Sequence, residues 1–566
     1  MNLEQLIDRL KRTPSFMENV THWETLPAKE ARFAPFPEAL DGRLPPVLAA
    51  RGVHQLYTHQ REAFDRVAEG RDICVVTPTA SGKTMCYNLP VLNAILKNGD
   101  ARALYLFPTK ALSADQVSEL YELIEAMDVD VKTFTYDGDT PAAARRQVRQ
   151  AGHIVVTNPD MLHSGILPHH TKWVKLFENL QYVVIDEIHA YRGVFGSNLA
   201  NVIRRLTRLC KFYGSNPQFI CCSATIANPG ELASTLIGRP VDVIDQSGAA
   251  SGEKHIVFYN PPVVNKQLGI RKSVLQETLH IASMLVDNDI STIVFGKSRL
   301  TVEVLTRHLK ERVKDPFGNA GRVRGYRGGY LPTLRREIER GLRKGEIRAV
   351  VSTNALELGI DIGQLDACVL CGYPGSIAST WQEAGRAGRD GEDAVCCLLY
   401  QPGDVRLNTF LIDHAQDMSQ MDEQTRQVVT ARAKERLRQM TFYATGGGCL
   451  RAKILQYFGE KVEKPFCGNC SGCMARDVSR QAGQIVAAVI AMNGRYGKAT
   501  VACVLCGQAD ARLRERGLDK LSAFGSMKAE GEANVRAMID ELIAGDVLTV
   551  TAGDYPLLQE GAYARD

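Results

Sequence analysis

The chain has 566 residues, with 68 lysines and arginines against 64 aspartates and glutamates, a formal net charge of +4 at pH 7. Hydrophobic residues make up 45% and charged residues 23%, a balance that excludes a collagen-like, low-complexity or wholly disordered chain. No apolar run approaches the roughly 18 residues that a membrane span needs, and we expect no secretion signal. The 15 cysteines are too sparse for a disulfide scaffold, so we expect a cytoplasmic protein with reduced thiols.

Short apolar runs alternate with helical stretches over most of the chain and predict an α/β fold. Such runs recur between residues 73 and 221 and again between 291 and 370. Continuous apolar strands separated by helices indicate parallel sheets that helices cover on both faces. The segment 246–252, rich in glycine, alanine and serine, is the expected linker between two such domains. Beyond about residue 405 the pattern becomes helical, then rich in cysteine, then helical again.

The strand predicted at 73–76 runs into a sequence typical of a phosphate-binding loop. Residues 77–84 read Thr-Pro-Thr-Ala-Ser-Gly-Lys-Thr and precede a helical stretch. Backbone N–H groups at a helix N-terminus bind an anion, a lysine reaches the β- and γ-phosphates, and a hydroxyl holds magnesium. The strict pattern has glycine at position 77, so the match alone leaves an accidental Gly-Lys-Thr open. The candidate nucleotide-binding residues are Thr79, Ala80, Ser81, Gly82, Lys83 and Thr84.

Two adjacent carboxylates, Asp186 and Glu187, follow the strand predicted at 182–185. Ligands of open α/β sheets bind at this end of the strands. We expect Asp186 to hold magnesium together with Thr84, and Glu187 to orient or deprotonate the attacking water. A solvated turn would explain Asp-Glu alone, but it explains Asp-Glu downstream of a phosphate loop poorly. The two half-sites together predict NTP hydrolysis.

Further motifs follow one another along the two α/β halves. They are Leu-Tyr-Thr-His-Gln at 56–60, Pro-Thr-Lys-Ala-Leu at 108–112, Thr-Asn-Pro-Asp at 157–160, Ser-Ala-Thr at 223–225, Ile-Val-Phe-Gly-Lys-Ser-Arg at 293–299, Ser-Thr-Asn-Ala-Leu-Glu-Leu-Gly-Ile-Asp at 352–361 and Gln-Glu-Ala-Gly-Arg-Ala-Gly-Arg at 382–389. In this order they resemble the motifs of the superfamily 2 helicase core, and the last string is the most specific. The resemblance covers residues 50–400 and implies two tandem RecA-like domains with ATP and Mg²⁺ between them.

The same resemblance implies roles for individual residues. Gln60 would recognise the adenine, and Gly359 and Asp361 would contact the nucleotide. The residues that would contact the nucleic acid from these motifs are Thr109, Lys110 and Thr353. These roles come from the resemblance alone.

Charge gives a physical reason for the arginines of the last motif. A developing γ-phosphate needs guanidinium donors, and Arg386 and Arg389 are three residues apart, so a helix would place them on one face. Such arginines contribute about 10³–10⁵-fold to the rate of phosphoryl transfer. Because they belong to the second domain, hydrolysis would require the cleft to close, and closing and reopening would move the bound strand.

Within the superfamily, the core resembles the MrfA/YprA-like repair helicases more than RNA helicases. The strings that carry this resemblance lie at 79–84, 106–112, 186–197 and 326–330. The loop from Tyr191 to Phe195 directly follows the acidic pair. Its aromatic rings would either stack on a single-stranded base or form a buried plug.

A basic stretch predicts a path for the nucleic acid. Residues 312–348 hold eleven basic against four acidic side chains, interleaved with Tyr326 and Tyr330. Such a local excess suits a phosphate track despite the nearly neutral total charge, and Arg327 is the candidate contact. A solvated basic helix is the alternative for part of this stretch.

Four cysteines in the C-terminal third have the spacing of a zinc site. Cys449, Cys467, Cys470 and Cys473 are separated by 17, 2 and 2 residues. Four thiolates form a closed tetrahedral site, and clustered cysteines in a cytosolic chain indicate a metal before disulfides. The strings at 440–444, 457–460 and 467–470 resemble the RecQ zinc-binding module, although Leu450 stands where that family usually has an arginine.

Residues 481–558 resemble the winged helix of RecQ helicases, more weakly than the core motifs do. The strings at 504–507, 518–525 and 535–548 carry this resemblance. A β-wing is expected around Thr551-Ala552-Gly553-Asp554. Tyr555 would either stack on a terminal base pair or anchor the wing in the core, and the Pro that follows it slightly favours the anchor.

The expected fold is α/β, with two tandem RecA-like parallel-sheet domains followed by a helical zinc-binding module and a winged helix. The expected boundaries are 1–50 for an N-terminal extension, 51–245 and 253–405 for the two RecA-like domains, 406–480 for the zinc module and 481–566 for the winged helix. The expected activity is that of an ATP-dependent DNA helicase, moving 3′ to 5′ in repair or recombination, with ATP, Mg²⁺ and Zn²⁺ as cofactors. Its partner would be DNA, single-stranded and at duplex junctions, with no membrane; a monomer is the first expectation, and protein partners are open.

Rival functions remain open from the sequence. An RNA helicase of the same superfamily is disfavoured by the zinc and winged-helix region, because winged helices more often handle DNA duplex ends. A DNA-binding protein with a degenerate motor is disfavoured by the intact Lys83, Asp186 and Glu187. The third rival is a translocase that strips proteins from duplex DNA without separating the strands, and the sequence leaves it open.

Overall fold

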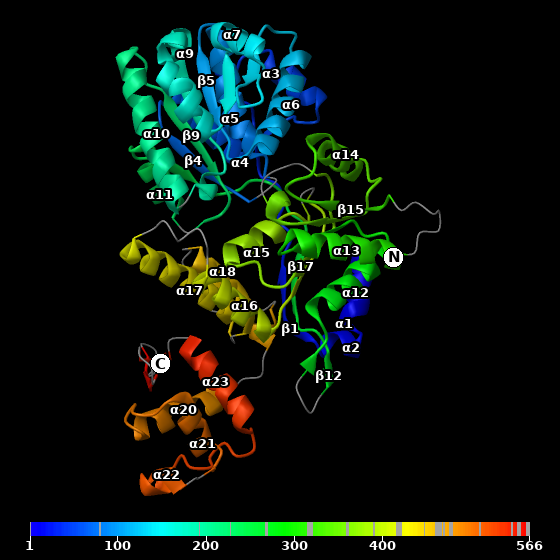
Figure 1. Ribbon diagram of the computed structural model, residues 1–566, viewed down its shortest axis with the longest axis vertical. Helices are drawn as coiled ribbons and strands as arrows, with labels where there is room; N and C mark the ends of the chain where they lie inside the picture. The colour runs from blue at the N-terminus through cyan, green and yellow to red at the C-terminus, as the bar shows by residue number, and fades with distance from the viewer. Residues whose placement is uncertain are drawn as a thin grey trace.

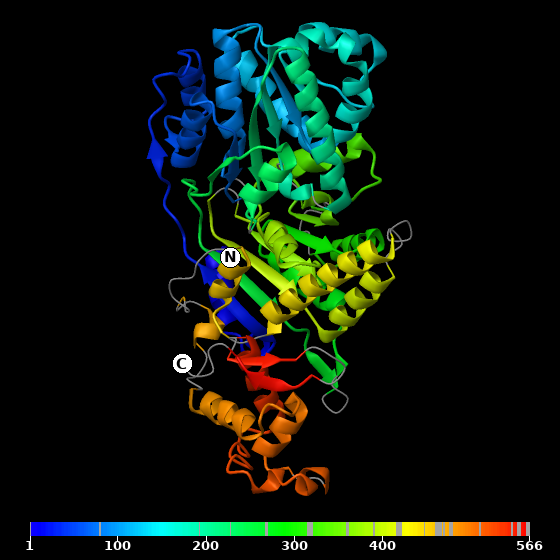
Figure 2. The same ribbon diagram turned by 90° about the vertical axis from the view of Figure 1, so that its left-hand side faces the viewer.

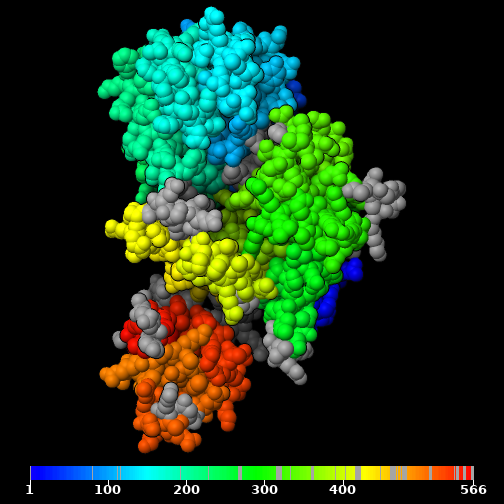
Figure 3. Space-filling model, in the orientation of Figure 1, coloured from blue at the N-terminus to red at the C-terminus, as the bar shows by residue number. Residues whose placement is uncertain are grey.

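Figure 1 shows the computed structural model of the protein, an elongated molecule with the first α/β domain at one end and the C-terminal unit at the other. The second α/β domain and the helices that follow it lie between them, and Figure 3 shows the same order on the surface. The structure describes residues 2–78, 81–191, 193–226, 228–265, 270–313, 321–357, 362–388, 391–414, 422–445, 448–458, 467, 470–474, 479–508, 511–544, 547–551 and 556–561.

The first domain is built on a seven-stranded parallel sheet in the order β10-β4-β9-β8-β5-β7-β6. Each face of the sheet has its own apolar core: Val75 and Ile220 point to one, and Val76 and Phe219 to the other. The strands are β4 (Ile73–Val76), β5 (Arg102–Leu106), β6 (Thr133–Thr135), β7 (Ile154–Thr157), β8 (Leu180–Ile185), β9 (Gln218–Ser223) and β10 (Asp242–Ile244). The larger helices are α3 (Leu44–Ala50), α4 (Thr58–Ala68), α5 (Lys83–Lys97), α6 (Lys110–Ala126), α7 (Ala142–Ala151), α9 (Val174–Asn179), α10 (Gly193–Phe212) and α11 (Pro229–Ile237). The parallel sheet covered on both faces is therefore confirmed.

The second domain repeats this plan with one antiparallel edge strand. Its seven-stranded sheet has the order β1-β11-β18-β17-β14-β16-β15, and only β1 runs antiparallel to its neighbour. The strands are β1 (Val20–Leu26), β11 (Lys254–Tyr259), β14 (Thr292–Gly296), β15 (Val323–Tyr326), β16 (Ala349–Ser352), β17 (Ala367–Cys371) and β18 (Ala394–Leu399). The helices are α12 (Val274–Asp287), α13 (Arg299–Arg312), α14 (Pro332–Arg343) and α15 (Ile377–Ala384), and a short hairpin of β12 (Val263–Asn265) and β13 (Ile270–Arg271) follows β11. The predicted α/β class with two such domains is confirmed.

The N-terminal segment belongs to the second domain, although it precedes the first in sequence. Helix α1 (Leu3–Lys11) and the turn α2 (Pro14–Met17) lead into β1, and α1 buries Leu6 and Ile7 in the core that also holds Val257 and Leu399. The chain then crosses to the first domain, where β2 (Phe33–Ala34) pairs with β3 (Leu56–Tyr57). Figure 2 follows this blue segment from one domain to the other. The sequence pattern gave no sign that the two domains are connected twice.

The packing of α1 against the second domain should contribute to the stability of the N-terminal segment. Leu6→Ala should destabilise the docked N-terminal segment by about 2–5 kcal/mol, because removing a fully buried leucine side chain leaves a cavity. Hydrogen exchange at the amides of β1 measures this local opening. Arg9→Ala, which changes an exposed position of the same helix, is the control. Equal exchange in the two variants would contradict the docking.

The two crossing segments are hydrogen-bonded to each other. Lys29 N–H donates to the Ser251 carbonyl at 2.8 Å, and Ser251 N–H donates back to the Lys29 carbonyl at 3.0 Å. Nearer the first domain, Arg32 N–H donates to the Gly248 carbonyl at 2.8 Å. We call residues 27–32 and 245–253 the paired hinge. It contains the predicted linker 246–252 and a second segment, residues 27–32, that the sequence analysis did not identify.

The helices after the second domain pack against it. Helices α16 (Pro402–Asp413), α17 (Glu423–Thr445), α18 (Leu450–Tyr457) and α19 (Ser471–Met474) make up this region. Met440 and Tyr443 of α17 lie in one apolar core with Ile377 of α15 and Leu398 of β18. The cysteine-bearing segment is thereby attached to the second α/β domain.

The C-terminal unit has an apolar core of its own, which includes Ile485, Val504 and Ile539. It consists of α20 (Ser479–Ala491), α21 (Lys498–Leu505), α22 (Ala511–Glu515), α23 (Glu532–Ala544), β19 (Leu548–Val550) and β20 (Leu558–Glu560). The two strands are antiparallel, with Val550 opposite Leu558, so they form the hairpin that was predicted as a wing. Among the described residues, no helix has the length and apolar character needed to cross a membrane.

Candidate functional site

The predicted phosphate loop forms the turn between β4 and α5. Lys83 is the first residue of α5, and Gly82 before it has a left-handed backbone (φ 75°), which favours glycine. The ammonium of Lys83 donates to the carbonyls of Thr77 at 2.7 Å and Pro78 at 3.1 Å, so it lies against the inside of the turn. Thr77, which stands where the strict pattern has glycine, is buried, and its Oγ1 lies 2.6 Å from Oγ of Ser81. This departure from the pattern braces the loop.

The acidic pair follows β8 directly. Asp186 accepts hydrogen bonds from the N–H of Glu187 at 2.8 Å and the hydroxyl of Tyr87 at 3.4 Å. Burial, and then the charge of Glu187, raise the pKa of Asp186 to about 7, so a cation beside it would stabilise its ionised form. Oε2 of Glu187 lies 3.3 Å from Nδ1 of His189, which accepts the N–H of Ala224 at 3.2 Å. His189 therefore lies between the acidic pair and the Ser-Ala-Thr segment at the end of the neighbouring strand β9.

The residues predicted to hold magnesium lie in one hydrogen-bonded cluster. Thr84 Oγ1 donates to Oε1 of Gln116 at 3.0 Å, and the Tyr87 hydroxyl lies 2.9 Å from the same oxygen and 3.4 Å from Oδ2 of Asp186. A hydroxyl and a carboxylate are the hard oxygen donors that Mg²⁺ prefers together with water and phosphate oxygens. The donor set therefore fits Mg²⁺, and Thr84 and Asp186 stay the predicted protein ligands. Gln116 and Tyr87 carry no motif, and the sequence analysis missed them.

Gln60 connects the phosphate loop to a neighbouring cavity. Its Nε2 donates to the carbonyl of Gly82 and its Oε1 accepts the N–H of Tyr57, both at 3.0 Å. A cavity of about 360 Å³ lies next to it, lined also by Phe33, Tyr57 and Met85. The rings of Phe33 and Tyr57 stack at 5.3 Å between centroids. Phe33 comes from the N-terminal segment and lies in none of the motifs of the first domain.

The core motifs of both domains line one cavity of about 330 Å³. The first domain contributes Ser81 of the phosphate loop and Thr225 of the Ser-Ala-Thr segment, and the second contributes Gln382 and Gly385. Both strands of the paired hinge and Arg451 of α18 close its other sides. The structure therefore brings the phosphate loop of the first domain and the last motif of the second domain to one cavity between the domains.

The geometry of the last motif differs from the helical face that the sequence analysis considered. Helix α15 ends at Ala384, and Arg386 follows in a turn, with its N–H bonded to the Glu383 carbonyl at 3.1 Å. Gly388 has φ 69°, a conformation that continues no helix. Arg386 is fully buried. A turn instead of a helix therefore positions this guanidinium.

The candidate nucleic-acid contacts lie at element ends in both domains. Thr109 caps α6 by accepting the Leu112 N–H at 3.3 Å, and Thr353 caps a short 3₁₀ turn. Lys110 is half exposed and pairs with Asp139 at 2.6 Å. Arg327 pairs with Glu303 at 2.7 Å and lies over the ring of Tyr330.

The two aromatic residues of the loop after the acidic pair differ in exposure. Tyr191 is 1% exposed and packs in the core, whereas Phe195 is 39% exposed, and their ring centroids are 5.3 Å apart. Their contacts to nucleic acid stay predictions.

Several predicted site residues lie outside the part of the chain that the structure describes. They are Thr79, Ala80, Gly359, Asp361, Arg389 and Tyr555. Their roles stay predictions.

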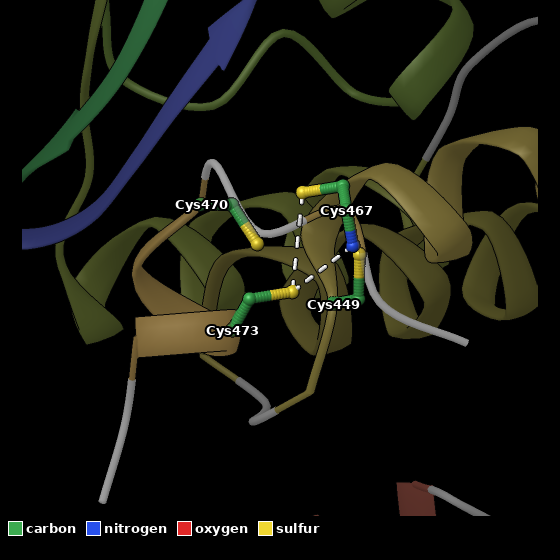
Figure 4. Close-up of side chains that lie close together, drawn as sticks. All are labelled: Cys449, Cys467, Cys470 and Cys473. Carbon is green, nitrogen blue, oxygen red and sulfur yellow. Dashed lines mark hydrogen bonds between the residues drawn. The ribbon is translucent and has the colours of Figure 1, made fainter. Parts of the chain in front are cut away.

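The predicted zinc ligands converge. The four sulfur atoms, from Cys449, Cys467, Cys470 and Cys473, lie within 4.8 Å of one another and point toward one centre (Figure 4). In a tetrahedral site with Zn–S distances of about 2.3 Å, neighbouring sulfurs are about 3.8 Å apart, so the cluster fits zinc. Sγ of Cys449 also accepts the N–H of Ala452, and Sγ of Cys473 accepts the N–H of Cys467 at 3.2 Å. Such N–H bonds stabilise thiolate charge.

The cysteine cluster contacts the edge of the second sheet. Glu24 of β1 forms an antiparallel bridge with Cys470, and the N–H of Trp23 donates to Oγ of Ser471 at 3.2 Å. Tyr443 of α17 donates to the buried carboxyl group of Glu24 at 3.4 Å. The N-terminal strand therefore lies between the second domain and the zinc site.

Four known protein families match successive parts of the chain. They are DEAD/DEAH box helicase at residues 57–232, helicase conserved C-terminal domain at 272–391, RecQ zinc-binding at 402–474 and RQC domain at 474–566.

Individual relatives share the same parts. The chain is 61% identical over 413 residues to YprA of Bacillus subtilis (strain 168), named an uncharacterized ATP-dependent helicase, covering 73% of this chain and 54% of YprA. It is 27% identical over 525 residues to the ATP-dependent DNA helicase RecQ of the same organism, covering 91% of this chain and 81% of RecQ. A crystal structure of the helicase MrfA bound to DNA and AMPPNP matches with a TM-score of 0.69 and 56% identity, covering 74% of this chain and 57% of MrfA. The chain thus spans about half the length of YprA and of MrfA.

Proposed function

Because the chain has a superfamily 2 helicase core like that of MrfA and YprA, followed by RecQ-type zinc-binding and RQC domains, we propose that it is an ATP-dependent DNA helicase that moves 3′ to 5′. It would couple ATP hydrolysis to translocation on single-stranded DNA and to duplex unwinding in repair or recombination. The observation that carries the proposal is the cavity between the domains, because residues of the phosphate loop and of the last motif line it together.

The proposed chemistry assigns a role to each motif side chain near that cavity. Lys83 would bind the β- and γ-phosphates, and Thr84 and Asp186 would hold Mg²⁺, which neutralises phosphate charge when bound. Glu187 lies beside Asp186 and would take a proton from the attacking water. Arg386 would stabilise charge on the γ-phosphate from the second domain. Hydrolysis would then depend on closure of the two domains, and each cycle of closure would move the strand.

Support for DNA over RNA comes from the relatives and the C-terminal unit. MrfA was solved with DNA, and RecQ is named a DNA helicase. The β19–β20 hairpin of the RQC unit would meet the duplex end, and the half-exposed Lys110 would contact the strand backbone. The 3′ to 5′ direction rests on family resemblance alone.

Strand separation on matched substrates tests the proposal. DNA and RNA duplexes with either a 3′ or a 5′ single-stranded tail are incubated with the protein and ATP, and Lys83→Ala is the control. We expect unwinding of 3′-tailed DNA only, and none by the variant. Unwinding of RNA would replace the proposal with an RNA helicase. DNA-stimulated ATP hydrolysis without separation of any duplex would leave a translocase.

A further inference from the structure

His59, next to Gln60, lies between the phosphate loop and the paired hinge. Nδ1 of its buried ring accepts the N–H of Gly248 at 3.1 Å, and Nε2 lies 2.9 Å from the carbonyl of Ser81. Because Nδ1 accepts, the proton must be on Nε2, which donates to Ser81. Burial lowers the pKa of His59 to about 4, so this neutral form persists at physiological pH. One side chain therefore joins the phosphate loop and the hinge through two backbone groups.

The hinge is held tightly to the first domain at this point. Arg32 N–H donates to the carbonyl of Gly248, Arg32 Nη2 donates to the carbonyl of Ser247, and Thr58 N–H donates to the carbonyl of Arg32, all between 2.8 and 3.0 Å. A Cβ atom on Gly248 would lie 2.7 Å from the Arg32 carbonyl oxygen, so the two crossing segments approach as closely as glycine permits. Movement at Gly248 must therefore be shared by both strands of the hinge.

Only a few residues further on, the same segment is fixed to the second domain. Glu253 N–H donates to the carboxylate of Asp393 at 2.7 Å, and a Cβ on Gly252 would lie 2.6 Å from the Asp393 nitrogen. Residues 249–251 are all that separates the contact with His59 from the contact with the second domain. A shift of the phosphate loop that moved His59 would thus be passed to the second domain with little slack.

We propose that His59 is a positioning residue that couples nucleotide binding at the phosphate loop to the angle between the two domains. This inference rests on the proposed function, because it assigns the coupling step of that motor to one side chain. The ring of His59 stacks on Tyr57 at 5.8 Å, and Tyr57 stacks on Phe33 beside the cavity near Gln60. The stacked rings therefore connect His59 to the cavity near Gln60, and its hydrogen bond to Ser81 connects it to the phosphate loop.

The coupling predicts how nucleotide changes DNA affinity. If nucleotide and DNA both bind best to the closed arrangement of the domains, then nucleotide raises the affinity for DNA. The ratio of DNA affinities with and without nucleotide then measures the coupling. Fluorescein-labelled single-stranded DNA is titrated with the full chain in the presence and absence of AMPPNP. We expect a ratio of about five or more for the wild type, in the usual range of coupling between sites.

Two substitutions distinguish the effect of the two His59 hydrogen bonds from the effect of packing of its ring. His59→Phe keeps an aromatic ring against Tyr57 but removes both hydrogen bonds, and it should bring the affinity ratio close to one. His59→Gln offers an amide donor and an amide acceptor, and it should recover most of the ratio. His153→Phe is the matched control, because His153 also accepts a backbone N–H, from Lys132 at 3.0 Å, but lies away from the hinge.

The outcomes separate the inference from the function on which it rests. A wild-type ratio near one would overturn the inference, while the unwinding assay would still decide the proposed function. The inference would also be overturned if His59→Phe had the same ratio of DNA affinities, with and without AMPPNP, as the wild type. Equal losses in His59→Phe and His59→Gln, with lower melting temperatures for both, would show a structural role instead. The coupling role of His59 would be supported if the affinity ratio fell in His59→Phe, recovered in His59→Gln and stayed unchanged in His153→Phe.

Discussion

ATP hydrolysis should fall by about 10²–10⁴-fold when Glu187 is replaced by Gln, because the amide cannot accept a proton from the attacking water. The substitution keeps the size of the side chain and its position next to Asp186. Glu187 is buried at the end of β8, within 3.3 Å of His189, so the amide would be held where the carboxylate is. ATP should therefore still bind, and the loss should fall on kcat.

Single-turnover hydrolysis and binding of a fluorescent ATP analogue, measured on the same protein, test this expectation. Lys83→Ala should lose binding as well as hydrolysis, since it removes the ammonium that meets the phosphates. Glu178→Gln, an exposed position on α9 of the same domain, should behave as the wild type. A loss smaller than tenfold in Glu187→Gln would remove Glu187 as the general base.

The inner, parallel strands of the two sheets could be predicted from the sequence because they are buried on both faces. The inner strands of the first domain therefore contain apolar runs, such as 73–76 or 182–185, whereas the edge strands β6 and β10 carry polar residues. The motif loops follow these strands at their carboxyl ends, so the strand pattern also places the phosphate loop and the acidic pair. This part of the site follows from local sequence.

The N-terminal strand could not be predicted in the same way. β1 pairs with β11, more than 200 residues later in the chain, and its sequence Val-Thr-His-Trp-Glu-Thr-Leu carries polar residues at several positions. Glu24 is acceptable there because Tyr443 donates to its carboxyl group, and burial raises the pKa of Glu24 to about 7. A buried carboxyl group whose partner lies on a distant helix leaves no local pattern. The paired hinge and Phe33 were missed for the same reason.

Within the site, residue identity was easier to predict than backbone form. The spacing of the last motif suggested a helical face, but α15 ends at Ala384 and a turn carries Arg386. Tyr191 and Phe195 are equally aromatic in sequence, yet only Phe195 is exposed. Burial depends on packing across β8 and α10, and a short motif does not encode it.

Loss of one zinc ligand should have the largest effect on the C-terminal half. Cys470→Ser should remove zinc and unfold the segment that carries the cysteines, because apparent zinc binding energies of about 10–16 kcal/mol in four-ligand sites contribute to folding. Wild-type protein should contain about one zinc per chain. Metal analysis after gel filtration and thermal unfolding measure both effects.

Cys506→Ser is the matched control, because Cys506 is also a buried cysteine but lies in the core of the C-terminal unit, outside the cluster. It should keep its zinc and lose little stability. Wild-type protein without zinc, or Cys470→Ser with full metal content and an unchanged melting temperature, would contradict the assignment.

The position of the cluster adds a second consequence to the loss of zinc. Cys470 and Ser471 bond to Glu24 and Trp23 of β1, and β1 is the edge strand of the second sheet. Unfolding of the cluster should therefore raise hydrogen exchange in β1, while the central strands β14 and β17 stay protected. Because the chain leaves β1 directly for the paired hinge, zinc would stabilise one of the two connections between the domains. Unchanged exchange in β1 of a zinc-free variant would restrict the metal to a local role.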